Sequence, residues 1–175
     1  MFFIVILIVI VSIILSGIYI VRQQTAAVIE RFGRLNKVSS SGLNIKIPVV
    51  DRIAGRVNLR VRQLDVSVET KTKDNVFVFV MVSVQYFVIP DKVADAFYKL
   101  QNAEAQITSY VYDAVRARVP TINLDDVFET KDDIAQAVKM ELEEIMSEFG
   151  YGIVKALVTD INPDAKVKES MNHIN

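Results

Sequence analysis

The first 21 residues of the chain contain no Asp, Glu, Lys or Arg, and only Ser12, Ser16 and Gly17 interrupt the apolar run. A helix of this length measures about 31 Å, which matches a bilayer hydrocarbon core of about 30 Å. The Ile, Val, Leu and Phe residues of the run favour insertion by about 5–10 kcal/mol. The sequence therefore predicts a membrane-spanning helix over residues 1–21.

Three other kinds of segment could explain an apolar run at the start of a chain. A cleaved signal peptide has a basic start, a shorter apolar region and a small-residue cleavage site, none of which is present. A buried core helix rarely needs so many uncharged residues. A pilin-like subunit resembles this layout but carries a Glu five residues into its mature helix, where this chain has Val5. We expect a retained anchor that includes Phe2, Phe3, Ile6, Ile10, Ile14, Ile18 and Tyr19.

Positive charge follows the apolar segment directly. Cytoplasmic flanks of membrane helices are enriched in Lys and Arg, so the bias predicts a single-pass protein of the cell membrane whose folded part is cytoplasmic. The same side chains are candidates for contact with lipid headgroups. They are Arg22, Arg31, Arg34 and Lys37.

Charge is segregated along the rest of the chain. Residues 22–62 carry nine Lys or Arg against two acids, a net of +7, whereas residues 63–175 carry eleven against nineteen, a net of −8. A basic stretch beside an anchor can meet anionic headgroups, at about 1 kcal/mol per residue. An ordinary solvated face is the alternative. Nucleic acid is disfavoured because the stretch lacks interleaved aromatic residues.

Catalytic chemistry finds little support in the sequence. The chain has no Cys and one His, His173, which excludes thiolate metal sites and makes a Ser–His pair improbable. No nucleotide-binding or hydrolase motif occurs. We expect no enzyme activity, no cofactor and no metal, and we interpret the paired acids as solvated charge. These pairs are Asp125-Asp126, Asp132-Asp133 and Glu143-Glu144.

The first half of the remaining chain has strand-like patterns. Residues 24–32 alternate in polarity, and residues 57–61 alternate with a phase that flips by residue 64. A strand cannot bury both sets on one side, so a bulge or bend is expected near Arg62–Leu64. The polar turn at residues 73–75 lies between two apolar runs and predicts a hairpin.

The second half has helical spacing. Helices are predicted over residues 91–100, 103–119 and 132–149, followed by a strand over residues 151–161. Asn162 and Pro163 indicate the start of a further helix at residues 162–175. Its apolar positions are candidates for an oligomer interface: Val167, Met171 and Ile174. The expected class is α+β: strands, then helices, then a strand and an outgoing helix.

Five segments, taken in order, resemble the SPFH domain of stomatin, prohibitin and flotillin proteins, also called band 7. The pattern is most similar to bacterial stomatin-like slipins and plant hypersensitive-induced-reaction proteins. The segments are VIERFGR at 28–34, GLNIKIPVVDRI at 42–53, LDVSVETKTKDNVFV at 64–78, YVYDAVRARVPTINLDDVFETKDDIA at 110–135 and YGIVKALVTDINPDAKVKESMNHIN at 151–175.

This resemblance implies an SPFH domain at residues 22–161 after an anchor at 1–21, with the start of a coiled coil at 162–175. It implies a membrane scaffold that forms homo-oligomeric rings or cages, organises membrane microdomains and regulates membrane channels or proteases. A regulatory adaptor of a membrane-bound protease is the alternative, and a hydrolase is a remote one. Two departures stand out: Ser41 occupies a position where the family often has Pro, and residues 1–21 contain no Pro, which favours a spanning anchor over a hairpin.

Overall fold

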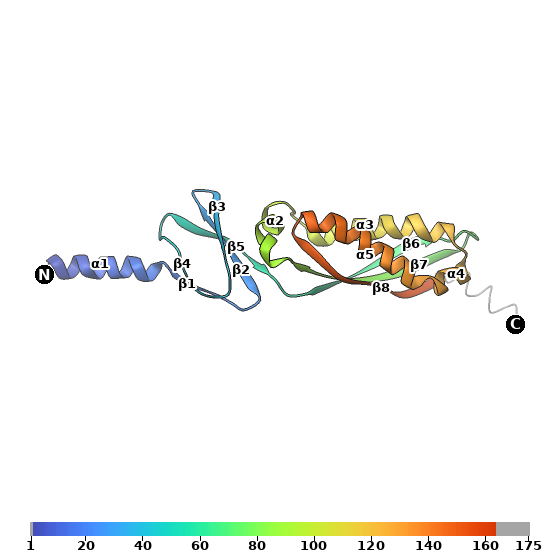
Figure 1. Cartoon of the computed structure of the whole chain (residues 1–175), viewed down its shortest axis with the longest axis horizontal. Helices are drawn as coiled ribbons and strands as arrows, with labels where there is room; N and C mark the ends of the chain where they lie inside the picture. Colours follow the sequence, from blue (N-terminus) through green and yellow to red (C-terminus); the bar gives the residue numbers. More distant parts are fainter. Residues whose placement is uncertain (1, 164–175) are drawn as a thin grey trace. The chain divides into compact units, whose positions relative to one another are not determined.

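The computed structural model describes residues 2–163, which fold into two compact units. Unit 1 lies within Met1–Arg60 and Val88–Lys99, and unit 2 lies within Val61–Phe87 and Leu100–Asn175. Strands dominate the first half and helices the second (Figure 1). The predicted α+β class is confirmed.

The N-terminal helix α1 spans Phe2–Ser16, and the predicted helix over residues 1–21 is therefore wrong at its end. Gly17 breaks it, because its carbonyl accepts a hydrogen bond from the Lys46 N–H at 2.8 Å. A Cβ at Gly17 would lie 2.5 Å from the Lys46 carbonyl oxygen, so only glycine fits this approach. The β-branched residues that follow form a strand, β1 (Ile18–Val21), which removes Ile18 and Tyr19 from the helix.

Unit 1 contains two small antiparallel sheets. β1 pairs with β4, and β2 lies between β3 and β5. The predicted strand at residues 24–32 is confirmed as β2. Tyr19, Val21, Ala27 and Ile29 form one buried cluster of this unit, with Ile53 packed against them. Further buried apolar side chains of the unit are Ala26, Val28, Val93 and Ala96. The remaining strands are β2 (Thr25–Arg31), β3 (Arg34–Ser39), β4 (Gly42–Ile45) and β5 (Asp51–Asn58).

A short helical segment completes unit 1. The 3-10 turn η1 (Pro90–Lys92) leads into α2 (Val93–Tyr98), within the predicted range 91–100. Phe97 of α2 lies over Gly55, where an added Cβ would meet the ring at 2.4 Å. Tyr98 donates a hydrogen bond to Glu30 Oε1 at 2.7 Å, which ties α2 to β2.

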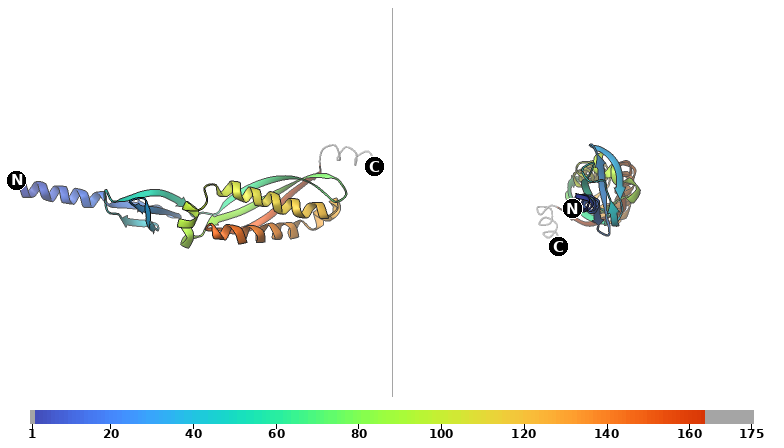
Figure 2. Two further views of the ribbon diagram at one scale, coloured as in Figure 1. Left: turned by 90° about the horizontal axis from the view of Figure 1, so that it is seen from above. Right: turned by 90° about the vertical axis from the view of Figure 1, so that its left-hand side faces the viewer.

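Unit 2 packs helices on one three-stranded sheet of order β6-β7-β8 (Figure 2). β6 and β7 form the predicted hairpin, and the predicted helices appear as α3 and α5. Its core is large and includes Tyr86, Ile107, Leu142 and Met146. The elements are β6 (Arg62–Lys71), β7 (Phe77–Val88), α3 (Ala103–Arg118), η2 (Val119–Thr121), α4 (Leu124–Glu129), α5 (Lys131–Glu148) and β8 (Tyr151–Pro163).

The hairpin turn also positions α4. Asp74 Oδ1 accepts hydrogen bonds from Thr72 Oγ1 at 2.6 Å and from the Leu124 N–H at 3.1 Å. These bonds, the one from Thr72 foremost, lower the pKa of the Asp74 carboxyl below its usual range. The turn and the start of α4 are thus one hydrogen-bonded feature.

Two boundaries differ from the expectation. The phase flip is resolved by a break in the strand rather than a bulge: β5 ends at Asn58 and β6 begins at Arg62. Asn162 and Pro163, expected as the start of a helix, are instead the last two residues of β8. The candidates Val167, Met171 and Ile174, and His173, lie outside the described residues.

Candidate functional site

The helix α1 presents apolar side chains on all sides. Every side chain of Phe2–Ser16 that the structure describes is exposed, including the anchor candidates Phe2, Phe3, Ile6, Ile10 and Ile14. A helix of this length measures about 22 Å at 1.5 Å per residue. Within residues 2–163, no helix combines the length and the apolar character needed to cross a membrane.

The exposed apolar surface continues onto the two-stranded β1–β4 sheet. Ile18 pairs with Ile45, and Ile20 pairs with Leu43, so the four side chains share one face. All four are exposed, Leu43 at 70% and Ile45 at 67%. On the opposite face Tyr19 is buried, and its hydroxyl lies 2.6 Å from Ser39 Oγ. Tyr19 therefore belongs to the core of unit 1.

Two tight turns add apolar side chains at one end of the β3-β2-β5 sheet. Phe32 has a φ of +50° and Val49 a φ of +72°. Such values are rare for bulky residues and carry strain. Phe32 is 83% exposed and Val49 is fully exposed. Arg31 pairs with Asp51 across the sheet, so the two turns lie at the same end of it.

Asp51 holds the second turn in place. Its carboxylate accepts a hydrogen bond from Arg31 Nε at 2.8 Å and another from the Ile47 N–H at 2.9 Å. The Arg31 bond, followed by the Ile47 bond, lowers the pKa of Asp51. Ile47 is half exposed and precedes the turn. We call the following set the N-terminal apolar surface: Ile18, Ile20, Phe32, Leu43, Ile45, Ile47 and Val49.

The four predicted headgroup contacts have different environments. Arg31 is paired with Asp51, and Lys37 Nζ donates to the Ile45 carbonyl at 2.8 Å, so both stabilise the fold. Arg22 and Arg34 are exposed, and within the described part of the chain neither makes an ion pair. Arg22 and Arg34 therefore remain the candidates for contact with lipid headgroups.

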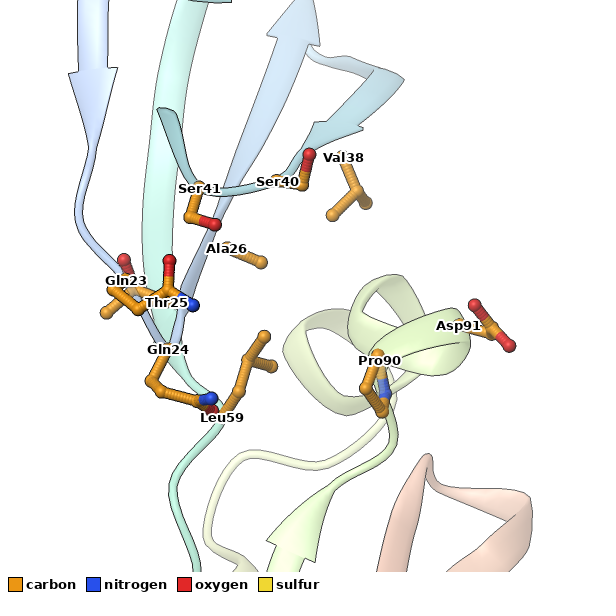
Figure 3. Close-up of a pocket in the computed structure, with 10 residues that line it drawn as sticks. All are labelled: Gln23, Gln24, Thr25, Ala26, Val38, Ser40, Ser41, Leu59, Pro90 and Asp91. Carbon is orange, nitrogen blue, oxygen red and sulfur yellow. The ribbon is translucent and has the colours of Figure 1, made fainter. Parts of the chain in front are cut away.

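A hollow of about 480 Å³ lies in unit 1 (Figure 3). Amide and hydroxyl side chains, among them Gln23, Gln24 and Ser41, surround it, and Asp91 is the one charged residue of its lining. A lone carboxylate without a neighbouring base or nucleophile does not form a catalytic pair. The hollow therefore supplies no chemistry for a reaction.

In unit 2 the buried side chain of Tyr86 meets two polar side chains that are about half exposed, those of Arg62 and Glu104. Tyr86 donates to Glu104 Oε1 at 3.1 Å, and Arg62 forms an ion pair with the same carboxylate. Burial, with the bond to Glu104, raises the pKa of Tyr86 to about 12. These contacts join β6, β7 and α3. None of the three residues lines a hollow described for residues 2–163, so we interpret the contacts as structural. Within residues 2–163, no group of His, Cys, Asp and Glu side chains is arranged to hold a metal ion.

Sequence reasoning missed most of the N-terminal apolar surface. The alternation of Leu43, Ile45 and Ile47 with Asn44 and Lys46 is typical of a strand with one apolar face. That signal predicts the strand but not its exposure, since exposure depends on the absence of a covering element. Phe32 and Val49 are exposed because turns place them beyond the ends of their strands.

Comparison with known proteins identifies a family. Residues 19–173 match the model of the SPFH domain / Band 7 family. The chain is 44% identical over 156 residues to hypersensitive-induced response protein 4 of Arabidopsis thaliana, which covers 89% of this chain and 53% of the relative.

A second group of relatives is more distant. The chain is 30% identical over 152 residues to mitochondrial stomatin-like protein 2 of Homo sapiens, covering 86% of this chain and 42% of the relative. The chain thus spans about half the length of the curated relatives it matches.

Proposed function

Because the chain belongs to the SPFH domain / Band 7 family, as its sequence predicted, we propose that it is a membrane-attached scaffold that assembles with copies of itself. In this proposal the assembly organises a membrane microdomain and regulates membrane proteins there, and the chain is not an enzyme. The carrying observation is the N-terminal apolar surface, which continues the exposed apolar side chains of α1.

The exposed apolar side chains of α1 and of the N-terminal apolar surface indicate a contact surface. Soluble monomers rarely leave contiguous apolar patches of more than a few hundred Å² uncovered. Burying a Leu or Ile side chain gains about 1.5–3 kcal/mol. A bilayer supplies that burial for α1 and for the adjoining face of the β1–β4 sheet at once.

The arrangement we propose is a single pass. An apolar helix shorter than the hydrocarbon core is accommodated by local thinning of the bilayer and by its flanking residues. The β1–β4 sheet would then lie in the interfacial layer, with Arg22 and Arg34 near the headgroups. The positive flank of α1 favours a cytoplasmic location for the folded units at the cell membrane.

Charged substitutions in α1 test the attachment. Lys at a membrane helix centre costs about 2.5–3.5 kcal/mol, so Ile6→Lys with Ile10→Lys should move the full-length chain out of carbonate-washed membranes. The matched variant Ile6→Ala with Ile10→Ala should stay in the membrane pellet. Equal retention of both variants would contradict the proposed attachment.

Particle mass tests the assembly. Full-length protein extracted in a gentle detergent should give particles of many copies by mass photometry, and crosslinking in native membranes should yield abundant contacts between copies. A single monomeric species under these conditions would contradict the scaffold. Crosslinks mainly to one other protein would favour the adaptor.

A further inference from the structure

The hollow of unit 1 combines an apolar floor with a polar rim. The floor consists of the apolar side chains of Ala26, Val38, Leu59 and Pro90, which Figure 3 shows around one space. The rim carries exposed amide and hydroxyl side chains, namely those of Gln23, Gln24, Ser40 and Ser41. Its volume of about 480 Å³ lies within the range of about 300–1,000 Å³ that is typical of ligand sites, and apolar lining with a few polar groups is their usual composition.

Two hydrogen bonds hold the walls of this hollow in place. The Leu59 N–H donates to the Gln24 carbonyl at 3.0 Å, which fixes the residue after β5 against the turn between β1 and β2. Asn44 Nδ2 donates to the Ser40 carbonyl at 2.9 Å, which fixes the loop between β3 and β4. The walls are therefore formed without a ligand, and a preformed site lowers the entropy that binding costs.

One residue of the rim has a strained backbone. Gln24 has a φ of +58°, which glycine adopts without cost and a residue with a side chain does not. Within the described part of the chain, the side chains of Gln23, Gln24, Ser40 and Ser41 make no hydrogen bond or ion pair. No internal contact of the Gln24 amide thus compensates the strain, and strained residues cluster at ligand sites.

The lining discriminates between classes of ligand. Among the described residues that surround the hollow there is no Lys or Arg, and Asp91 is negative, so phosphates and carboxylates are disfavoured. The same residues include no aromatic ring on which a nucleobase or a sugar would stack. Side-chain amides and hydroxyls both donate and accept hydrogen bonds, as the N–H and C=O groups of a peptide do. The lining is therefore complementary to a peptide backbone that carries an uncharged side chain.

We propose that this hollow binds a short extended peptide segment of a partner protein. One apolar side chain of the peptide lies on the floor beside Ala26 and Leu59, and its backbone bonds to the amides of Gln23 and Gln24. Main-chain bonds then provide affinity, and the floor provides specificity for the side chain. The inference goes beyond the proposed function, because the site lies within unit 1 and needs no second copy. Peptide binding and self-assembly can therefore fail independently.

Peptide pools of defined design test the proposal. Each pool contains fluorescent, amidated pentapeptides with one fixed central residue and mixed flanking residues, and anisotropy measures binding to the full-length protein in nanodiscs. Pools with a central Leu, Ile or Val should bind at least about tenfold more tightly than pools with a central Asp or Glu. Methylation of the central backbone nitrogen should weaken the tightest pool about three- to tenfold. A preference for Asp or Glu, or no binding by any pool, would overturn the proposal.

A variant that fills the hollow assigns the binding to it. Ser41→Trp adds a bulky side chain from an exposed loop position and should weaken the tightest pool at least about tenfold. The matched variant Ser109→Trp, at an exposed position of α3, should bind as the unchanged protein does. Equal binding by both variants would place the peptide elsewhere and overturn the proposal.

Gln24→Gly separates a binding role from a structural one. The substitution removes the amide and relieves the backbone strain, so it should weaken binding about three- to tenfold without lowering Tm. A side chain with a structural role would instead lower Tm when removed. Unchanged peptide binding in Gln24→Gly would contradict the assigned contact, whereas the mass of the assembled particles should be the same in all three variants.

Discussion

Unit 2 buries its apolar side chains among α3, α5 and the three-stranded sheet, whereas unit 1 leaves large apolar side chains on its surface. One buried cluster of unit 1 is centred on Tyr19 and Ile29, and Val28, Val93 and Ala96 are buried in this unit as well. The difference lies in what covers the large apolar side chains. Unit 2 encloses its own, whereas in the proposed arrangement a membrane surface covers Leu43, Ile45 and their neighbours in unit 1.

The largest expected effect tests the internal packing of unit 2. Leu142 of α5 is fully buried, so Leu142→Ala should lower the free energy of unfolding by about 2–5 kcal/mol. Met140→Ala, on the exposed side of the same helix, should change it by no more than about 0.5 kcal/mol. Hydrogen exchange should place the loss in β6, β7 and β8. A uniform loss across both units would show that they do not unfold separately.

The two units contain a matched pair of glycines that sharpens the comparison. Gly55 lies under Phe97 in unit 1, and Gly152 lies under Phe87 in unit 2, where added Cβ atoms would meet the rings at 2.4 Å and 2.6 Å. Gly55→Ala and Gly152→Ala should each cost about 1–3 kcal/mol by overpacking. Hydrogen exchange should show each loss in its own unit. Replacing the facing Phe by Leu should recover part of each loss, and no recovery would contradict the ring contact as its cause.

A smaller effect concerns the buried tyrosine of unit 2. Tyr86→Phe removes the bond to Glu104, whose side chain is about half exposed, and should cost about 0.5–1.5 kcal/mol at neutral pH. The folded-state pKa of about 12 lies above the usual value of about 10, so Tyr86 contributes stability that is lost as the pH rises from about 10 to about 12. Thermal unfolding of the variant should depend less on pH in that window. The same slope in both proteins would contradict the assignment to Tyr86.

The smallest effect concerns the turn that presents Val49. The lowered pKa of Asp51 means that its contribution to stability is present above about pH 3.9 and is lost as the pH falls through the folded-state value. In Asp51→Asn the unfolding temperature of unit 1 should fall less steeply as the pH is lowered below about 3.9. Asp74→Asn is the matched control in unit 2, because the pKa of the Asp74 carboxyl is also lowered. If only Asp74→Asn changed how the unfolding temperature depends on acidic pH, the ion pair of Asp51 with Arg31 would not stabilise unit 1.

Local patterns predicted much of this fold. The period-2 alternation located β2, the polar turn located the β6–β7 hairpin, and helical spacing located α3 and α5. Local patterns failed where distant contacts decide the structure. Ile18–Val21 is apolar enough for a helix, but it becomes a strand because β4 pairs with it and Ser39 bonds to Tyr19.

The candidate site was predictable only in part. The apolar run of α1 and the exposed Arg22 and Arg34 follow from the sequence. The ion pair of Arg31 with Asp51 does not follow from the sequence, because the two residues lie 20 positions apart along the chain and meet only across the sheet. The exposure of Phe32 and Val49 likewise depends on turn geometry that a hydropathy pattern does not contain.

Contact between the N-terminal apolar surface and lipid is the central claim, and depth-dependent quenching measures it directly. Leu43→Cys and Met140→Cys each give the chain one thiol for a fluorescent label, and both positions are exposed. In vesicles of brominated lipid, the label at residue 43 should be strongly quenched and the label at residue 140 unaffected. Equal fluorescence at both positions, with the protein in the membrane fraction, would contradict the claim.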